Sequence, residues 1–191
     1  MRAHGCIAGV NAGFFSADSA GSPLGLCISN GVRISNLASS SFAVAGVLYD
    51  TGKEIILERT KTYMQRKSPI NMKNAIQGGP FLVENGRPVA GLHDDRKALR
   101  TFVATDGRGH WCLGSSSPLS LKELSQWLCE PNCTGRFQIQ TALNLDGGSS
   151  SAYWVQTPHR NYPSIKQVRN YIGLIPRTGQ ITLPASEKSA R

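Results

Sequence analysis

The sequence predicts an α+β fold, namely a single domain of mixed, largely antiparallel β-sheet with few helices packed on it. Many short apolar segments are separated by turn signals that contain Gly, Asn or Asp, which is typical of antiparallel strands joined by hairpins. Only one segment shows the spacing of an amphipathic helix. The chain has 191 residues without an internal repeat or a linker, and this length favours one domain with a complete core.

Strands are predicted throughout the first half of the chain. Asn30-Gly31 is a two-residue hairpin signal, and Asp50-Thr51-Gly52 separates two further apolar segments. The segment 60–71 is polar and weakly patterned, so no element is assigned to it. The predicted strands are 5–10, 24–28, 32–34, 41–49 and 53–59.

The second half contains the predicted helix and the closing strands. Ser120-Leu121-Lys122-Glu123 has the form of a capping box, and leucines then recur at helical spacing, so a helix is expected from here to near Pro131. A hairpin turn is expected at Glu84-Asn85-Gly86-Arg87. The polar tail 177–191 is expected to be flexible. The predicted strands are 100–105 and 110–114, which pair with each other, and 141–145, 152–156 and 171–175.

The net charge of +9 favours anionic partners such as phosphorylated sugars or acidic polymers. The basic residues are dispersed, and the segment 59–67 lacks the interleaved aromatic side chains of a nucleic-acid platform, so no nucleic-acid partner is expected. No apolar run approaches the ~18 residues of a membrane span. Met1-Arg2-Ala3-His4 precedes a strand rather than the apolar region of a signal peptide, a pattern expected of a fragment or of a gene start assigned late.

The five cysteines leave the disulfide pattern open. Cys129-Glu130-Pro131-Asn132-Cys133 fits no zinc site, because it has no matching second pair. Its Pro-Asn pair suits a loop that a disulfide closes, and a Cys6–Cys27 bridge is conceivable. Two bridges would imply an oxidising compartment, whereas buried free thiols explain the count equally well.

The segment 142–151 is the richest in groups that can do chemistry. An apolar, strand-like run carries Asn144 and Asp146, then breaks into Gly147-Gly148 and three serines. Carboxylate, unhindered backbone N–H groups and hydroxyls are thus gathered within a few residues, which suits an anionic ligand beside an acid–base group. The simpler interpretation is a hairpin turn, for which Asp-Gly is a strong signal.

Three further segments combine polar groups with glycines or a strand start: 11–15, 77–80 and 100–101. Glycines at such points let a ligand approach the main chain. Each segment also has a structural explanation. Gly13 fits a bulge, Gly78-Gly79 fits a turn, and Arg100 fits a surface ion pair.

Standard catalytic motifs do not occur in the sequence. There is no Gly-x-Ser-x-Gly nucleophile elbow, no His-Glu-x-x-His metal motif, no P-loop and no dinucleotide fingerprint. Among the histidines, only His93 stands beside two aspartates, and a solvated loop explains that arrangement better.

Taken together and in order, these segments resemble the phosphodiester glycosidase family. The family pattern Asn-Gly-Gly-Phe-Phe is matched by Asn11-Ala12-Gly13-Phe14-Phe15, and its Arg-Thr-Ala by Arg100-Thr101-Phe102. Its Leu-Asp-Gly-Gly-Gly-Ser is matched by Leu145-Asp146-Gly147-Gly148-Ser149-Ser150.

The resemblance extends to the segments between these motifs. The glycine-containing strand and Asn-Gly hairpin of the family correspond to 76–86, and the helix from Ser120 falls where the family has one. Val168-Arg169-Asn170 is similar to the closing Val-x-Asn strand of the family. The resemblance therefore implies one phosphodiester glycosidase-like domain over 5–176.

The resemblance implies a hydrolase that cleaves a sugar-1-phosphodiester at the anomeric C–O bond without a cofactor. Departure of the phosphate builds positive charge on the sugar, which a carboxylate suits, and arginine suits phosphate oxygens. Asp146 is then the catalytic carboxylate and Arg100 the phosphate clamp. No metal-ligand set is predicted, and a divalent cation on Asp146 stays open. The substrate pocket is assigned to Asn11, Gly13, Gly78, Gly79, Gly147, Gly148 and Ser149, with Asn144 and Asn170 as orienting amides.

The chain departs from the family pattern at three positions. Ala12 replaces the second glycine, Ser149 replaces the third glycine after the aspartate, and Lys166 stands where many members have arginine. Ala12 and Ser149 motivate a second hypothesis, a non-catalytic binding module for anionic, phosphate-bearing glycans. Under either hypothesis the partner is a sugar phosphodiester or anionic glycan of a cell envelope or exopolysaccharide, and the expected location is periplasmic or secreted. The oligomeric state is not predicted.

Overall fold

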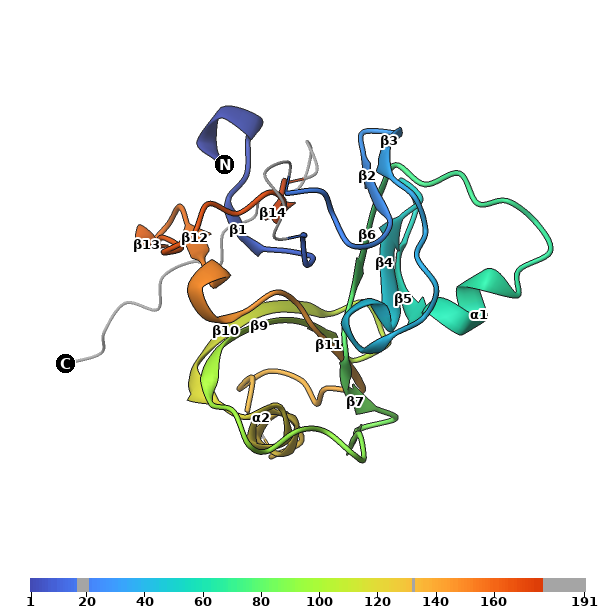
Figure 1. Cartoon of the computed structure of the whole chain (residues 1–191). Helices are drawn as coiled ribbons and strands as arrows, with labels where there is room; N and C mark the ends of the chain where they lie inside the picture. The colour runs from blue at the N-terminus through green and yellow to red at the C-terminus, as the bar shows by residue number, and fades with distance from the viewer. Residues whose placement is uncertain (17–20, 132, 177–191) are drawn as a thin grey trace.

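The computed structural model describes residues 1–16, 21–131 and 133–176, which form three antiparallel sheets with two α-helices (Figure 1). Every strand pair within these residues is antiparallel. The predicted architecture, mainly antiparallel sheet with few helices packed on it, is confirmed. The tail 177–191, predicted to be flexible, lies outside the described residues.

The first sheet has the strand order β3-β2-β6-β4-β5. β2 and β3 form the hairpin predicted at Asn30-Gly31, where both residues have positive φ, 49° and 79°. This backbone suits the primed turns that join antiparallel strands, and Asn-Gly adopts them readily. The strands are β2 (Cys27–Ser29), β3 (Val32–Ser35), β4 (Gly46–Asp50), β5 (Ile55–Arg59) and β6 (Asn74–Gly78).

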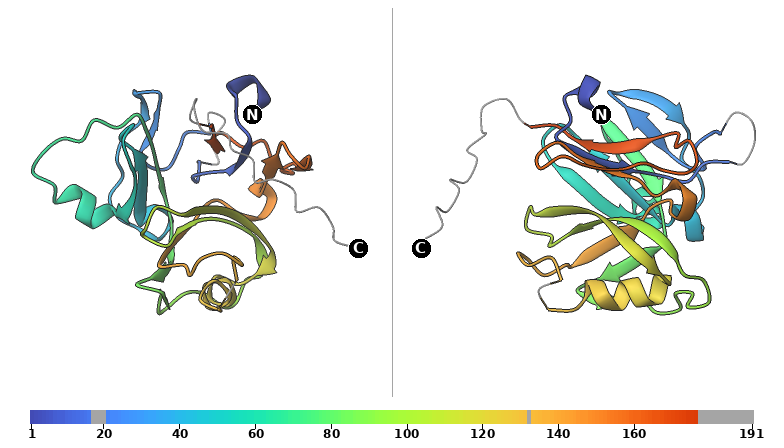
Figure 2. Two further views of the ribbon diagram at one scale, coloured as in Figure 1. Left: turned by 180° about the vertical axis from the view of Figure 1, so that it is seen from behind. Right: turned by 90° about the vertical axis from the view of Figure 1, so that its left-hand side faces the viewer.

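The second sheet has the strand order β10-β9-β11-β7-β8. It curves around helix α2 (Leu121–Leu128), which covers the face turned away from β1 (Figures 1 and 2). The strands are β7 (Phe81–Glu84), β8 (Arg87–Pro88), β9 (Ala98–Thr105), β10 (Trp111–Leu119) and β11 (Thr141–Asn144).

Helix α2 begins at the predicted capping box. The Glu123 N–H donates to Ser120 Oγ at 3.0 Å, and the Ser120 N–H donates to Glu123 Oε2 at 2.8 Å. The buried leucines of the helix pack with Phe102 of β9. Because side chains alternate along a strand, the next residue, Val103, points to the opposite face, where it packs with Val10.

The third sheet joins the two ends of the described chain, with the strand order β13-β12-β1-β14. β1 (Ala8–Asn11) lies in its interior and pairs with β12 (Tyr153–Val155) and β14 (Tyr171–Leu174). β13 (Arg160–Tyr162) forms one edge. The first strand of the chain is therefore held by segments more than 140 residues further on, such as Val155 opposite Ala8.

The sheets meet over a shared hydrophobic core. One buried cluster contains Val10 of β1, Ile76 of β6, Val103 of β9 and Leu143 of β11, so all three sheets contribute to it. Gly79-Pro80 is the whole connection from β6 in the first sheet to β7 in the second.

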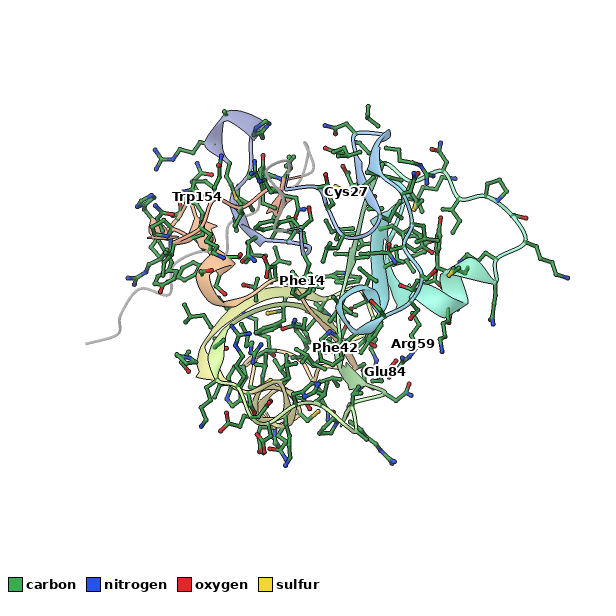
Figure 3. All side chains as sticks on the ribbon, in the orientation of Figure 1. Phe14, Cys27, Phe42, Arg59, Glu84 and Trp154 are labelled. Atoms are coloured by element: carbon green, nitrogen blue, oxygen red, sulfur yellow. The ribbon has the colours of Figure 1, made fainter. Side chains whose placement is uncertain are left out.

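A surface ion pair spans the same junction. Arg59 of β5 lies beside Glu84 of β7, and Arg59 Nε donates to Glu84 Oε1 at 2.7 Å (Figure 3). The Arg59 guanidinium also lies 5.2 Å from the ring centroid of Phe81. The pair is exposed, so it adds orientation to the junction more than stability.

Two elements of the structure have no counterpart in the sequence-based prediction. Helix α1 (Thr60–Met64) occupies part of the unassigned segment 60–71. The edge strand β13, Arg-Asn-Tyr, is exposed at all three residues, and its sequence lacks the apolar alternation by which a strand is recognised. The predicted strand 41–49 begins instead with a 3₁₀ turn, η2 (Phe42–Val44), and only its second part is extended as β4. Two further 3₁₀ turns are η1 (Arg2–His4) and η3 (Gly148–Ser150).

All five cysteines are free thiols in the structure. Cys6 precedes β1 of the third sheet and Cys27 lies in the first sheet, so this pair is not joined. Cys112, Cys129 and Cys133 all pack against the core cluster of α2. The free-thiol alternative therefore describes the structure. Among the described residues, no helix is long and apolar enough to cross a membrane.

The turn between β9 and β10 depends on Asp106. Its Oδ1 accepts the N–H groups of Arg108 at 2.8 Å and His110 at 3.0 Å, and its Oδ2 lies 2.8 Å from His110 Nδ1. Burial alone would raise the pKa of Asp106, but these hydrogen bonds outweigh it and lower the pKa to about 2. The ionised carboxylate therefore stabilises the folded state.

We expect Asp106→Asn to lower the Tm at pH 7, because the charge-assisted bonds are lost. A depressed pKa contributes stability above the ordinary value of 3.8, and this contribution disappears as the pH falls through about 2. The Tm difference between wild type and variant should therefore shrink between pH 4 and pH 2 in thermal unfolding followed by circular dichroism. Asp95→Asn, at a side chain that is 81% exposed, is the matched control. A Tm difference that does not change with pH would contradict this role.

Candidate active site

The predicted site segments converge around the residues that follow β11. The Asp146 N–H donates to the Ala12 carbonyl at 2.9 Å, the Leu145 N–H to the Thr101 carbonyl at 2.8 Å, and the Asn144 N–H to the Pro80 carbonyl at 2.9 Å. Each of the other three predicted segments thus borders the strand end that carries Asp146. Phe14, which follows β1, lies near the middle of the molecule where the sheets approach each other (Figure 3).

The Asn11 side chain holds these segments together. Its Oδ1 accepts the Thr101 hydroxyl at 2.7 Å and the Ala152 N–H at 3.0 Å, and its Nδ2 donates to the Asp146 carbonyl at 2.6 Å. Asn11 is 2% exposed and Thr101 is 0% exposed. The structure therefore assigns Asn11 to positioning the Asp146 backbone from inside the protein, and does not expose it as a pocket wall.

The Asp146 carboxyl is half-buried beside this network. Burial raises its pKa above the ordinary value, and hydrogen bonds from the Ser150 hydroxyl and the Gly147 N–H oppose the rise, as does the charge of Lys166. The Gly147 N–H donates to Asp146 Oδ1 at 2.9 Å. A carboxyl whose pKa is shifted by partial desolvation is typical of a functional site.

The turn after Asp146 has little room for larger side chains. A Cβ at Gly147 would lie 2.8 Å from the Leu99 carbonyl oxygen, and Gly148 has a φ of 61°, which favours glycine. The Ser149 carbonyl accepts the N–H groups of Ile165 and Lys166, both at 2.9 Å. The segment around Lys166 is thereby fixed onto the turn.

Lys166 supplies a positive charge that acts on Asp146, although no ion pair joins the two side chains among the described residues. Its side chain is exposed, and its charge is among the factors that favour the ionised carboxylate. Sequence reasoning recognised Lys166 only as a departure from the family pattern. No local signal links it to Asp146, because its place depends on the hydrogen bonds by which the segment before β14 is held on the Ser149 carbonyl.

The Arg100 guanidinium makes no hydrogen bond or ion pair with Asp146 among the described residues. Its Nε donates to the Leu119 carbonyl at 2.9 Å and its terminal nitrogen to the Arg96 carbonyl at 2.6 Å. Arg100 precedes Thr101 on β9, so its side chain leaves the opposite face of the strand from the Thr101 hydroxyl that contacts Asn11. The guanidinium is thus engaged with main-chain carbonyls in this geometry. The phosphate-clamp role of Arg100 stays a prediction.

Gly13, Gly78 and Gly79, which the sequence assigned to the substrate pocket, lie where main-chain segments pack closely against each other. A Cβ at Gly13 would lie 2.8 Å from the Gln77 carbonyl oxygen, and one at Gly78 would lie 3.1 Å from the Asn144 carbonyl oxygen. A Cβ at Gly79 would collide with the Phe42 carbonyl. These three residues are buried and let backbones pass closely under the site.

The two predicted orienting amides are both incompletely bonded. Asn144 Nδ2 donates to the carbonyls of Gly79 at 2.9 Å and Leu145 at 2.8 Å, whereas its buried Oδ1 has no partner within the described part of the chain. Neither amide atom of Asn170 has one, although both are buried. The Asn170 carbonyl accepts the Ala12 N–H at 3.2 Å, so this residue borders the same segment as Asp146. Unpaired buried amides at this position favour a ligand or water contact.

Sequence reasoning missed the Thr101 and Ser151 hydroxyls, which lie 3.3 Å apart in the buried network. The motif Arg100-Thr101 could have indicated the role of Thr101, because adjacent residues of a strand face opposite sides and only one of the two can face the site. No group of three or more His, Cys, Asp or Glu side chains in residues 1–16, 21–131 and 133–176 could hold a metal ion. The question of a divalent cation on Asp146 with hydroxyl and carbonyl ligands remains as the sequence left it.

Comparison with known proteins places the chain in a family. A family profile described as phosphodiester glycosidase matches residues 4–175. Among solved structures, the zebrafish N-acetylglucosamine-1-phosphodiester alpha-N-acetylglucosaminidase catalytic domain, auto-inhibited by its pro-peptide, is 18% identical with a TM-score of 0.69, covering 90% of this chain and 64% of that chain. A hypothetical protein from Synechocystis is 17% identical with a TM-score of 0.54, covering 90% of this chain and 52% of that chain.

The chain thus spans 64% and 52% of the length of these two structural relatives, and at such low identity the likeness shows the fold. No curated protein matches the sequence. The family profile, in contrast, covers nearly the whole described chain. The ordered motifs, their convergence on Asp146 and this match agree, and the chain belongs to the phosphodiester glycosidase family.

Proposed function

We propose that this domain hydrolyses the bond between the anomeric carbon of a sugar and the oxygen of a phosphodiester. The observation that carries the proposal is the placement of Asp146, whose half-buried carboxyl follows a backbone held by Asn11 and Ala12 at the point where the predicted segments converge. The name of the zebrafish relative makes N-acetylglucosamine the first sugar to test.

The chemistry of the reaction fits a carboxylate at this place. Departure of the phosphate leaves positive charge on the ring oxygen and anomeric carbon, and a nearby carboxylate stabilises that charge as nucleophile, base or counter-ion. Phosphate is a good leaving group, so a second carboxylic acid is less necessary than in ordinary glycosidases. The main chain of Asp146 is fixed by hydrogen bonds with Asn11 and Ala12, and its side chain supplies the one carboxylate that the reaction requires.

The phosphate is assigned first to Lys166 and the turn after Asp146. The N–H groups of Gly148 and Ser149 donate no hydrogen bond within the described residues, so they are available to phosphate oxygens. Lys166 adds a compact positive charge. Arg100 would contribute only after its guanidinium leaves the carbonyls of Leu119 and Arg96.

A binding module without turnover is the second candidate. It is favoured by Ser149, which puts a half-buried hydroxymethyl group on the turn where the family has glycine. Ala12, in contrast, is 1% exposed within the shared core, so its methyl group is accommodated by packing. Calorimetry with sugar phosphodiesters beside an assay for released sugar separates the two candidates, because the module binds without forming product.

The net charge of the chain supports a narrower assignment of the substrate and of where it is met. A net charge of +9 suits an anionic polymer, and we propose a cell-envelope or exopolysaccharide substrate met in the periplasm or outside the cell. A screen of nucleotide-sugars and sugar 1-phosphodiesters for release of free sugar tests this assignment directly. Release from none of them would overturn the proposed hydrolase.

We expect Asp146→Asn to lower kcat by about 10²–10⁴-fold, the usual range for loss of an acid–base group. The same variant should keep or raise the Tm at pH 7. A carboxyl whose pKa is raised by burial destabilises the folded state when ionised, and this penalty is absent below the ordinary pKa of 3.8. The Tm advantage of the variant should therefore grow from pH 3.5 to pH 7 in scanning calorimetry. Full activity in Asp146→Asn would refute the assignment.

We expect Lys166→Met to lower kcat/KM by roughly 10- to 100-fold, from the ~1.5–3 kcal/mol that a hydrogen bond to a charged group contributes. Lys166→Arg should retain most of the activity, since the charge remains. Lys67→Met, at an exposed lysine after α1, is the matched control.

Arg100→Met distinguishes the two assignments of the phosphate. If Arg100 mainly anchors the carbonyls of Leu119 and Arg96, the variant loses thermal stability, and activity measured below its Tm changes little. A loss of kcat/KM in Arg100→Met at unchanged Tm, with Lys166→Met fully active, would reverse our order of assignment.

A further inference from the structure

Three of the five cysteines gather on one side of the second sheet, around the end of helix α2. Cys112 lies on β10, whereas Cys129 and Cys133 follow the helix, and all three are half-buried against its hydrophobic cluster. The helix lies inside the curve that β9 and β10 form (Figure 1). The reaction assigned to Asp146 makes no use of these thiols.

The strand register directs the Cys112 side chain toward the helix. Cys112 pairs with Ala104, and residues directly opposite each other on antiparallel strands project to the same face of the sheet. Ala104 is 0% exposed and belongs to the cluster that contains Leu128, the last residue of α2. The Cys112 thiol therefore lies on the face that the helix covers.

The thiol of Cys133 lies at the C-terminal end of the same helix. Its S–H donates to the Leu128 carbonyl at 3.3 Å, and its side chain packs against the same hydrophobic cluster as Cys112. Burial raises the pKa of Cys112, and the negative charge of a Cys133 thiolate raises it further, which requires a short separation between the two sulfur atoms. The fold thus brings together two thiols from β10 and from the segment after α2.

Cys129 is the competing partner for Cys133, because the charge of the Cys133 thiolate acts on it as well. Cys129 ends α2 with helical backbone angles, φ −92° and ψ −7°, and its N–H donates to the carbonyls of Gln126 and Trp127. The Cα–Cβ bond of a helical residue tilts toward the N-terminus of the helix. The Cys129 side chain is therefore directed back along α2, whereas Cys133 lies beyond its C-terminal end. This geometry favours Cys112 as the partner.

We propose that Cys112 and Cys133 are a site of disulfide formation, which cross-links β10 to the segment between α2 and β11. The structure holds the reduced form of the pair. The oxidant is a low-molecular-weight disulfide such as oxidised glutathione, and an oxidising compartment favours the bonded form.

The reaction is a pair of thiol–disulfide exchanges. The thiolate of one cysteine attacks a sulfur of oxidised glutathione and releases one glutathione, and the thiolate of the other cysteine attacks the mixed disulfide and releases the second. The two protein thiols lose two protons and two electrons, and one oxidised glutathione becomes two molecules of glutathione. Burial raises the pKa of both thiols, so the link should form about tenfold faster at pH 8 than at pH 7.

The test oxidises the folded, reduced protein with oxidised glutathione at pH 8, blocks the remaining thiols with iodoacetamide and maps linked peptides by mass spectrometry. Wild type should lose two alkylatable thiols and yield a peptide that joins Cys112 to Cys133. Cys129→Ser is the matched control, because it removes the neighbouring thiol of the same cluster, and it should give the same link. Cys112→Ser and Cys133→Ser should give no internal link.

Thermal unfolding gives a second readout. A bond that closes a loop constrains the unfolded chain, so oxidation should raise the Tm of wild type and of Cys129→Ser by about 5–10 °C, and dithiothreitol should reverse the rise. Cys112→Ser should show no rise. Cys112→Ala keeps an apolar side chain against the cluster and replaces the serine variant if that variant does not fold.

Three outcomes would overturn the proposal: a link between Cys129 and Cys133, a link that includes Cys6 or Cys27, or glutathione adducts without any internal link. A Cys112–Cys133 link that leaves the Tm unchanged would also overturn the proposed cross-link between the two segments. These readouts do not depend on turnover, so the proposed function stands or falls separately.

Discussion

The buried carboxamide of Asn11 is the interaction on which the candidate site depends. It bonds to Thr101 on β9, to the backbone of Asp146 after β11, and to Ala152 before β12, segments that are 90, 135 and 141 residues away in sequence. Leaving a buried polar group unpaired costs roughly 1–3 kcal/mol, so these groups are stable inside the protein only when they meet. The polar network therefore fixes the geometry of three strand ends at once, which apolar packing alone would specify less sharply.

A second buried amide plays the same part for the first sheet. Gln77 Oε1 accepts the N–H groups of Leu26 at 2.6 Å and Ala38 at 2.9 Å, and its Nε2 donates to Thr60 Oγ1 at 3.1 Å. Gln77 is 2% exposed, and its main-chain carbonyl oxygen packs closely against Gly13, where a Cβ would lie 2.8 Å from it. The two amides are satisfied by the protein itself, whereas Asn144 and Asn170 keep buried amide atoms without a partner among the described residues. That contrast separates the framework of the site from the groups left for a substrate.

Much of the fold could be predicted because its signals are local. The Asn30-Gly31 hairpin, the Ser120 capping box and the strand after Asp106 each depend on residues within one turn of each other. The exposed edge strand β13 and the short helix α1 have no such signal. In the site, Asp146 was recognised from its own segment and from the resemblance. Lys166 and Thr101 were not assigned, because one is brought in by the segment before β14 and the other shares its motif with the more conspicuous Arg100.

The sequence by itself determined where most strands, the hairpin turns and the longer helix lie, which family the motifs resemble, and which carboxylate stands at their centre. Only the tertiary structure decided that the Arg100 guanidinium bonds to the carbonyls of Leu119 and Arg96, that Asn11 supports Asp146 from inside, and that the segment of Lys166 is bonded to the turn after Asp146. The physical reason is that turn and capping preferences act over a few residues. The face that a side chain presents becomes meaningful only once sheets from distant parts of the chain have packed against each other.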